Sequence, residues 1–322
     1  MNRVLSIFIF MGLMGVVCLG FCEDNPYPSK PIKLIIPYGT GTGVDIFSRT
    51  ITQALSERLK QQVFIENKPG MSAIVGVTAL KNSPPDGYTL GVLVSANAAQ
   101  PWLIRDIAFD IRRDFAPIVM MYEGPLVLTV NKAFPANNLD EFINYAKANP
   151  NKLFYGSLGV GTTTHLAAEM LLQVAGISAT HVPYKGSSEI HSSVAAQGIQ
   201  FSFDNYVSPR PLVDAGRLKA IVSTGKKRAS LIPNVALMSE TYPGVELNYW
   251  TGIAAPLGTP KAIVDKVNLE VQAILKSPSL IAKLNETGSE VGGGTPSEFD
   301  QRIKDDFDRF GRIIKTAGIK AE

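Results

Sequence analysis

Short apolar runs rich in β-branched and aromatic residues alternate along the chain with longer amphipathic stretches. The run 32–37 predicts a buried strand, and residues 44–60 have the apolar spacing of a helix. Runs 63–66 and 88–94 predict two further strands, with a helix over 74–81 between them. This β-α-β-α order predicts a parallel sheet with helices on its faces.

The alternation continues through the rest of the chain. Strands are predicted over 126–130, 153–157, 180–183, 200–204 and 218–223. Helices are predicted over 138–148, with Asn138 as the N-cap, and over 165–175, 188–197, 261–275 and 298–317. Because no long linker separates these α/β units, we expect two lobes that pack around a ligand-binding cleft.

The N-terminus has the pattern of a secretory signal peptide over residues 1–22. Arg3 is the only charge before an apolar run from Val4 to Phe21, and polar, Pro-rich sequence follows. A membrane anchor is the alternative, since the run is close to the length that spans a bilayer. Lipid anchoring at Cys22 is disfavoured because bulky Phe21 precedes it. With Cys18 and Cys22 removed, the mature chain has no cysteine for a disulfide, a metal site or a nucleophile.

The charge balance argues against a nucleic-acid partner. The chain has 31 basic and 28 acidic residues in 322, and its net charge is +3. The basic residues form no stripe or cluster, which a nucleic-acid surface would need.

A glycine-rich segment joins the first predicted strand to its helix. Its sequence from residue 37 is Pro-Tyr-Gly-Thr-Gly-Thr-Gly-Val-Asp, ending at Asp45. Glycines let the backbone approach a ligand closely, and the start of the helix presents free N–H groups and a positive dipole end to an anion. The segment therefore predicts an anion-binding loop with no residue suited to breaking bonds.

A second segment repeats this design. Residues 155–165 read Tyr-Gly-Ser-Leu-Gly-Val-Gly-Thr-Thr-Thr-His, again between a strand and a helix. The hydroxyls of Ser157, Thr162 and Thr163 can donate to an oxygen without adding charge. One such loop in each lobe would hold a dicarboxylate from both sides.

Three other sites fit the sequence less well. A dinucleotide site needs a third glycine where Val44 or Ile46 stands, although Glu66 has roughly the required spacing. A hydrolase triad of Ser157, His165 and Asp204 lacks the glycine two positions before the serine. The histidines have no metal-binding spacing, so we expect His181 to be half-buried in a strand and His191 to lie on a helix surface.

These segments and others resemble the Bug or TctC-like family, the extracytoplasmic receptors of tripartite tricarboxylate transporters. The resemblance extends from about Tyr27 to Ile319 and is strongest in the middle of the chain. Its marks are Tyr27–Ile32, Asp45 with Arg49, Glu66–Gly70, Pro85–Leu90, Asp114–Pro117, Tyr155–Ser157, Gly161-Thr162, His165-Leu166, His181–Gly186, Gly216–Ala220, Trp250–Gly252, Ala255-Pro256 and Thr259-Pro260.

The resemblance implies an α/β protein with the two-lobed Venus-flytrap fold of periplasmic binding proteins, each lobe a mostly parallel sheet flanked by helices. Lobe one would comprise residues 23–123 and 244–322, and lobe two residues 124–243. It implies a monomeric, non-enzymatic periplasmic receptor without cofactor or metal, which delivers a small carboxylate to a large and a small integral membrane subunit. The implied ligand-binding residues are Tyr38, Gly41, Thr42, Gly43, Asp45, Ser95, Asn97, Ser157, Gly161, Thr162, Thr163 and Asp204.

Several points stay open from the sequence. Family members usually have glycine where this chain has Thr42, Ser72 and Ala73, so the added side chains could narrow the pocket. Asp45 could contact ligand, cap its helix or pair with Arg49 one turn away. The ligand could be a di- or tricarboxylate, an amino acid or an aromatic acid, and a sensor that signals to a membrane partner is the alternative to a transport receptor.

Overall fold

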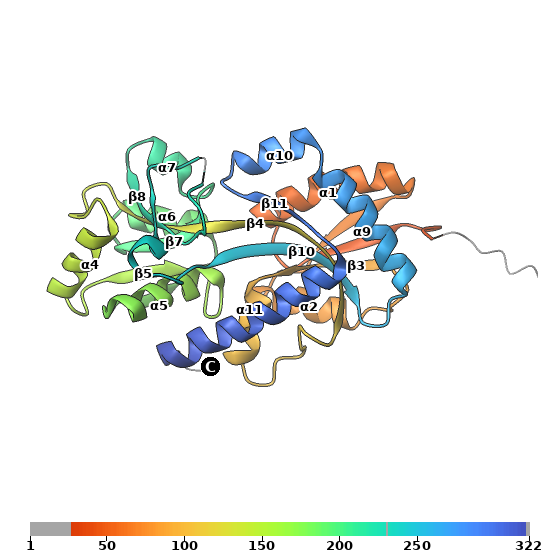
Figure 1. The fold of residues 1–322 in the computed structure, drawn as a ribbon, viewed down its shortest axis with the longest axis horizontal. Coiled ribbons are helices and arrows are strands. Elements are labelled where there is room, and N and C mark those ends of the chain that lie inside the picture. The colour runs from red at the N-terminus through yellow and green to blue at the C-terminus, as the bar shows by residue number, and fades with distance from the viewer. Residues whose placement is uncertain (1–26, 230, 320–322) are drawn as a thin grey trace, which may run out of the picture.

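The structure is a computed structural model that describes residues 27–229 and 231–319. The predicted signal peptide and both cysteines lie outside these ranges. Two halves lie side by side along the long axis of the molecule, and two long strands run between them (Figure 1). None of the helices in the described ranges is long and apolar enough to cross a bilayer.

The first sheet is built mainly from the N-terminal part of the chain. Its strands β1, β2 and β3 are parallel, whereas β10, the first part of β4 and β11 are antiparallel to their neighbours. The bounds are β1 Ile32–Ile36, β2 Val63–Asn67, β3 Thr89–Val94, β4 Phe115–Asn131, β10 Asn248–Pro256 and β11 Glu290–Gly293. The helices of this half are α1 Gly43–Leu59, α2 Ile74–Lys81, α3 Ala96–Ala99, α9 Lys261–Leu275, α10 Pro278–Asn285 and α11 Pro296–Ala317, with short 3₁₀ turns at Met71–Ala73 and Gln100–Trp102.

The second sheet continues from the other end of β4. There β6, β5 and β7 are parallel to one another, and β4 is antiparallel to β7 and β8. The strands are β5 Phe154–Ser157, β6 Thr180–Pro183, β7 Phe201–Asn205, β8 Leu218–Ser223 and β9 Ala236–Leu237. The helices are α4 Leu139–Ala148, α5 Thr163–Ala175, α6 Ser187–Ala195, α7 Arg210–Asp214 and α8 Met238–Thr241. The two-sheet α/β architecture agrees with the predicted fold class, although both sheets are mixed where mostly parallel sheets were expected.

Strand β4 accounts for this difference. The sequence predicted only its second part, 126–130, but the strand starts at Phe115 and belongs to both sheets. The first part was not predicted because it contains Pro117, Gly124 and Pro125. Proline cannot donate a hydrogen bond to a neighbouring strand, and glycine weakens a strand. Both β4 and its partner β10 lie where one half meets the other (Figure 1).

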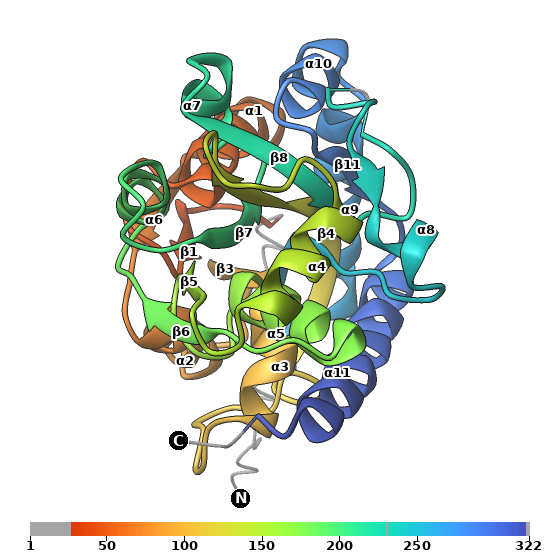
Figure 2. The ribbon, with the colours of Figure 1, turned by 90° about the vertical axis from the view of Figure 1, so that its left-hand side faces the viewer.

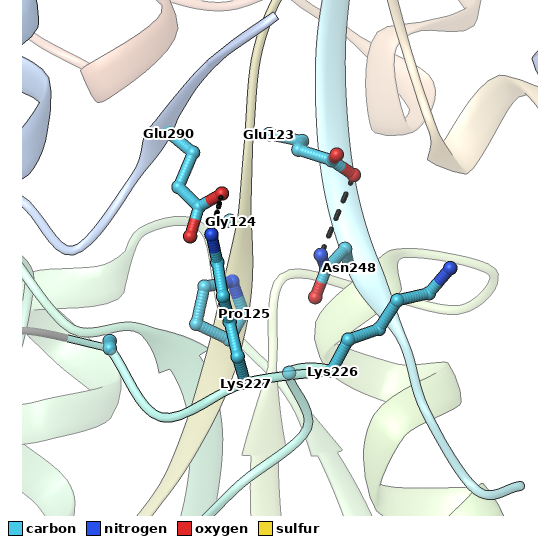
Figure 3. Close-up of a pocket in the computed structure, with 9 residues that line it drawn as sticks. Glu123, Gly124, Pro125, Lys226, Lys227, Asn248 and Glu290 are labelled. Atoms are coloured by element: carbon cyan, nitrogen blue, oxygen red, sulfur yellow. Dashed lines mark hydrogen bonds and ion pairs between the residues drawn. The ribbon is translucent and has the colours of Figure 1, made fainter. Parts of the chain in front are cut away.

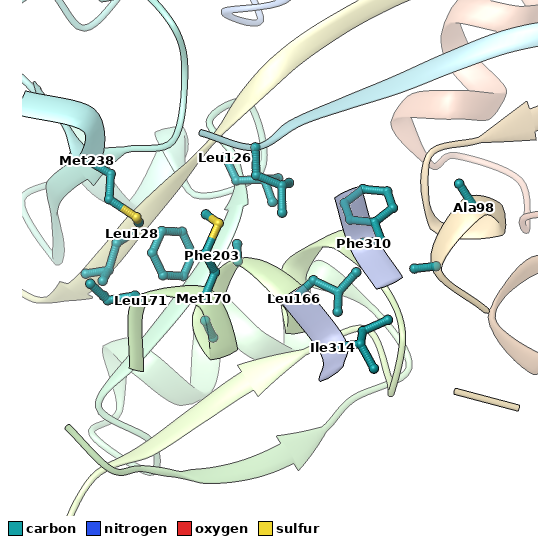
Figure 4. Close-up of a cluster of buried hydrophobic side chains, with 14 of the residues drawn as sticks. Ala98, Leu126, Leu128, Leu166, Met170, Leu171, Phe203, Met238, Phe310 and Ile314 are labelled. Atoms are coloured by element: carbon teal, nitrogen blue, oxygen red, sulfur yellow. The ribbon is translucent and has the colours of Figure 1, made fainter. Parts of the chain in front are cut away.

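One apolar core is shared by the two halves. Leu166 and Met170 of α5 pack together with Phe310 and Ile314 of α11, and each of these side chains is at most 4 % exposed (Figure 4). Helix α11 also packs on β4 and α3. The lobe boundaries at residues 123/124 and 243/244 remain a prediction, but the core shows that the halves meet along α5 and α11.

Candidate functional site

Loop one, residues 37–43, leads from β1 into α1. Thr42 is the N-cap: its Oγ1 donates to the Gly39 carbonyl oxygen at 3.0 Å and accepts from the Asp45 N–H at 3.3 Å. Gly41 has a φ of +80°, which a side chain would make unfavourable. The first helical N–H groups, including those of Gly43 and Val44, have no intrahelical acceptor and are available to an anion.

Asp45 holds the shape of loop one. Its carboxylate accepts hydrogen bonds from the Gly41 N–H at 3.0 Å, from Arg49 Nε and Nη2 at 2.9 Å each, and from Asn67 Nδ2 at 2.9 Å. Burial acts to raise the pKa of Asp45, but the bonds from Arg49, Asn67 and Gly41 outweigh it and lower the pKa. Because both oxygens already accept two bonds each, the carboxylate supports the loop and offers little to a ligand.

Loop two, residues 157–162, repeats this geometry at the start of α5. Thr162 Oγ1 donates to the Gly159 carbonyl oxygen at 2.7 Å and accepts from the His165 N–H at 3.4 Å. The Gly161 N–H donates to His165 Nδ1 at 3.4 Å, and the φ of Gly161 is +76°. Each of these three hydrogen bonds therefore has a counterpart in loop one, with His165 in the place of Asp45.

A stack of rings lies beneath loop two. Ser157 Oγ is 2.6 Å from His181 Nε2, and the His181 and His165 rings are 4.5 Å apart, with the Tyr155 ring stacked on both. Burial and the neighbouring His181 lower the pKa of His165 to about 3, and burial also lowers the pKa of His181. At neutral pH both rings are uncharged, so loop two carries no ionised group of its own.

Loop two touches the half of the molecule that contains loop one. A β-carbon on Gly159 would lie 3.1 Å from Ser72 Oγ, and one on Gly161 would lie 3.1 Å from Leu103 Cδ1. The Ser72 carbonyl oxygen in turn accepts from Gln100 Nε2 at 2.5 Å. The two halves therefore approach closely beside the candidate binding loops, with little room for a side chain at Gly159 or Gly161.

The backbone at Ser72 and Ala73 has a conformation that favours glycine. Met71, Ser72 and Ala73 have φ values of +45°, +52° and +83°, a region in which an L-residue costs about 1–2 kcal/mol. We expect the double change Ser72→Gly and Ala73→Gly to raise the free energy of unfolding by about 1 kcal/mol, since relieved strain outweighs the added freedom of the unfolded chain. Urea denaturation measures this, and a loss of stability would show that contacts of the two side chains outweigh the strain.

Three other predicted site residues of the first half have different surroundings. Tyr38 is half-buried, and burial raises the pKa of its phenol to about 12. Ser95 Oγ accepts from the Trp250 N–H at 3.3 Å, and Asn97 Oδ1 accepts from the Val94 N–H at 2.9 Å. Ser95 and Asn97 are at most 2 % exposed, so both brace the end of β3, and Tyr38 is the one with free surface.

Asp204 and His191 form a buried pair in the second half. His191 Nε2 lies 3.1 Å from Asp204 Oδ2, and the other carboxylate oxygen accepts from the Asn205 N–H at 2.8 Å. The prediction that His191 lies on a helix surface is wrong: it is 1 % exposed, because α6 turns this face onto β7. Ser157 is bonded to His181 and Asp204 to His191, so Ser157, His165 and Asp204 do not form a triad.

The structure also identifies two residues that the sequence reasoning did not assign to the site, Asn67 and His181. Asn67 Nδ2 bonds the Tyr38 carbonyl oxygen as well as Asp45, and His181 supports Ser157. Both residues lie within segments that carry the family resemblance, and that resemblance is the sequence signal that could have assigned them to the site. Trp250 is fully buried against Phe299.

A groove of about 220 Å³ lies away from these loops, where β4, β10 and β11 pass the segment after β8 (Figure 3). Lys227 Nζ pairs with Glu290 Oε2 across it at 3.0 Å, and Asn248 Nδ2 donates to Glu123 Oε2 at 3.5 Å. None of the predicted ligand-binding residues lines it. The described part of the chain contains no cluster of His, Cys, Asp or Glu suited to a metal ion.

Comparison with known proteins agrees with this geometry. Residues 47–319 match the model of the tripartite tricarboxylate transporter family receptor. A UPF0065 protein of Bordetella pertussis is 31 % identical over 326 residues, covering 100 % of this chain and 98 % of the relative.

Two solved structures have the same fold over nearly the whole chain. Rpa4515 of R. palustris, solved with adipate, has a TM-score of 0.86 and 32 % identity, covering 92 % of this chain and 100 % of that one. MatC (Rpa3494) of Rhodopseudomonas palustris, with bound malate, has a TM-score of 0.82 and 26 % identity. The match covers 89 % of this chain and 100 % of that one.

Proposed function

The chain belongs to the receptor family of tripartite tricarboxylate transporters, and from that premise we propose that it captures a small carboxylate between loop one and loop two. The duplicated threonine-capped helix start carries this proposal. In each loop a glycine with positive φ and a capping threonine shape a helix N-terminus whose first N–H groups are free to bind an anion. Two related structures were solved with adipate and with malate, which supports the same class of ligand.

The proposal includes the setting in which the protein works. Residues 1–22 direct export to the periplasm, residues 23–123 with 244–322 form one lobe, and residues 124–243 form the other. A ligand that contacts both loops favours the closed arrangement by its differential affinity, and the loaded receptor docks on integral membrane subunits. The neutral donors in the loops suit binding and release without covalent chemistry.

A thermal-shift titration with malate, adipate and citrate tests the ligand class. A ligand at about a hundred times its Kd adds about 2.7 kcal/mol of stability if it binds only the folded protein. We expect one acid class to raise the melting temperature clearly. Absence of a shift with every carboxylate, after refolding to remove any co-purified ligand, would contradict the proposal.

Matched threonine variants locate the binding to the two loops. Thr42→Val and Thr162→Val each remove a capping hydroxyl, and we expect each to weaken binding about tenfold, or 1.4 kcal/mol. Thr295→Val is the control, because Thr295 also caps its helix, α11, by accepting from the N–H three residues on, although its hydroxyl donates to the Glu298 side chain. It should lower stability by a similar amount and leave the Kd unchanged when measured by calorimetry.

A further inference from the structure

The third residue of the helix has the same task in both loops but a different chemistry. Asp45 Oδ2 accepts from the Gly41 N–H at 3.0 Å, and His165 Nδ1 accepts from the Gly161 N–H at 3.4 Å. Each bond fixes the glycine amide that precedes the capping threonine. Because Nδ1 accepts, the proton of the neutral His165 ring is on Nε2.

The next helical turn shows why the chemistry differs. Arg49 stands four residues after Asp45 and neutralises it through two hydrogen bonds of 2.9 Å. Glu169 stands four residues after His165, and its carboxylate accepts a hydrogen bond from the Tyr155 hydroxyl. A carboxylate at position 165 would therefore have an acidic neighbour in place of a cation.

The surroundings of His165 keep it uncharged. The ring is 4 % exposed and lies against Tyr155 of β5 and His181 of β6, while Glu169 follows on its own helix. Burial, with His181 second, lowers the pKa of His165 to about 3, and burial raises the pKa of Glu169. The imidazole is therefore a neutral acceptor throughout the neutral pH range.

We propose that His165 is a positioning residue for the bound carboxylate: it fixes the Gly161 amide and loop two as an acceptor that brings no negative charge. The proposal rests on the proposed function of loop two as one side of the ligand site. A carboxylate at position 165 would make the same hydrogen bond but would repel the anionic ligand, because no cation in the described structure is paired with that position.

Three substitutions separate charge from packing. His165→Asn keeps an uncharged acceptor, and we expect its Kd for a carboxylate to stay within about threefold of the wild type. His165→Asp keeps an acceptor but adds charge, and we expect binding at least tenfold weaker at pH 7.5. Gln173→Glu, near the other end of α5, is the control for added charge and should bind like the wild type.

The pH profile distinguishes positioning without charge from a merely structural role. Wild-type binding should be level between about pH 8 and pH 6, because His165 is neutral throughout. His165→Asp should recover affinity as the pH falls across this range, since burial beside Glu169 raises the pKa of the new carboxyl and protonation removes its charge. Fold is checked by the melting temperature of the ligand-free variants.

Two results would overturn the proposal. Equal losses in His165→Asn and His165→Asp would show that ring packing, and not charge, sets the affinity. Wild-type affinity in His165→Asp would show that position 165 does not act on the ligand. A failure of the proposed function itself is visible earlier and separately, because the wild-type protein would then bind no carboxylate in the first titration.

Discussion

Asp45→Ala is expected to raise the Kd for ligand at least a hundredfold and to lower the free energy of unfolding by about 3 kcal/mol. The Asp45 side chain is 3 % exposed and accepts four hydrogen bonds. Its removal leaves the Gly41 N–H and the Asn67 amide without their acceptor, so loop one loses the contacts that hold its shape. Calorimetric titration and urea denaturation measure the two effects.

A second ion pair of the same spacing is the control for this variant. Asp265 pairs with Lys261 on α9 one helical turn away, but both side chains are largely exposed. Asp265→Ala should change the stability by no more than about 0.5 kcal/mol and leave ligand binding unchanged. Similar losses in both variants would contradict the role of Asp45 in shaping loop one.

The direction of the Asp45 pKa shift also gives the sign of a pH effect. A carboxyl with a lowered pKa stabilises the folded state above its unfolded pKa of about 3.9, and this contribution disappears as the pH falls through the folded value. The stability difference between the wild type and Asp45→Ala should therefore be largest near neutral pH and narrow in acid. Denaturation curves over this range measure it.

Phe310→Ala is expected to cost about 3–5 kcal/mol of stability, because it opens a cavity in the core shared by α5 and α11. Phe310 is fully buried, with Leu166 and Ile314 near it in the same cluster (Figure 4). Since that core joins both halves, we expect both the wild type and the variant to unfold in one transition. Scanning calorimetry measures both the loss and the number of transitions.

Phe64→Ala is the matched control, because Phe64 is 42 % exposed on β2. Its loss of stability should be much smaller. If Phe310→Ala instead produced two separate transitions, the halves would be independent folding units and the shared core would contribute little.

Local patterns predicted most elements because their signals lie within a few residues. Asn138 caps α4 by accepting from the Glu141 N–H at 2.9 Å, as the sequence predicted. Strand β10 was not predicted, and β4 was predicted only in part, because their pairing depends on segments more than 100 residues apart. The burial of His191 likewise depends on which face of α6 packs on the sheet. The sequence of α6 alone does not determine that face.

The two candidate loops were also predictable, since their glycines, threonines and helix starts are contiguous in sequence. The roles of individual side chains could not be predicted from the sequence. Whether Asp45 faces a ligand or its own loop depends on Asn67, which comes from another strand. Ser95 is bonded to Trp250, 155 residues further along the chain, and no local pattern indicates that bond.

The packing of α5 on α11 also bears on how this protein could be made into an optical reporter. A rotation of the halves that preserves this buried contact must turn about a line close to it, so displacements grow with distance from that line. Helices α7 and α10 lie on the opposite side of the molecule in both views, where Arg210 Nη1 donates to the Glu286 carbonyl oxygen at 3.0 Å (Figures 1 and 2). Fluorophores on α7 and α10 would thus change their separation on such a rotation, whereas a pair on α5 and α11 would supply the constant reference signal.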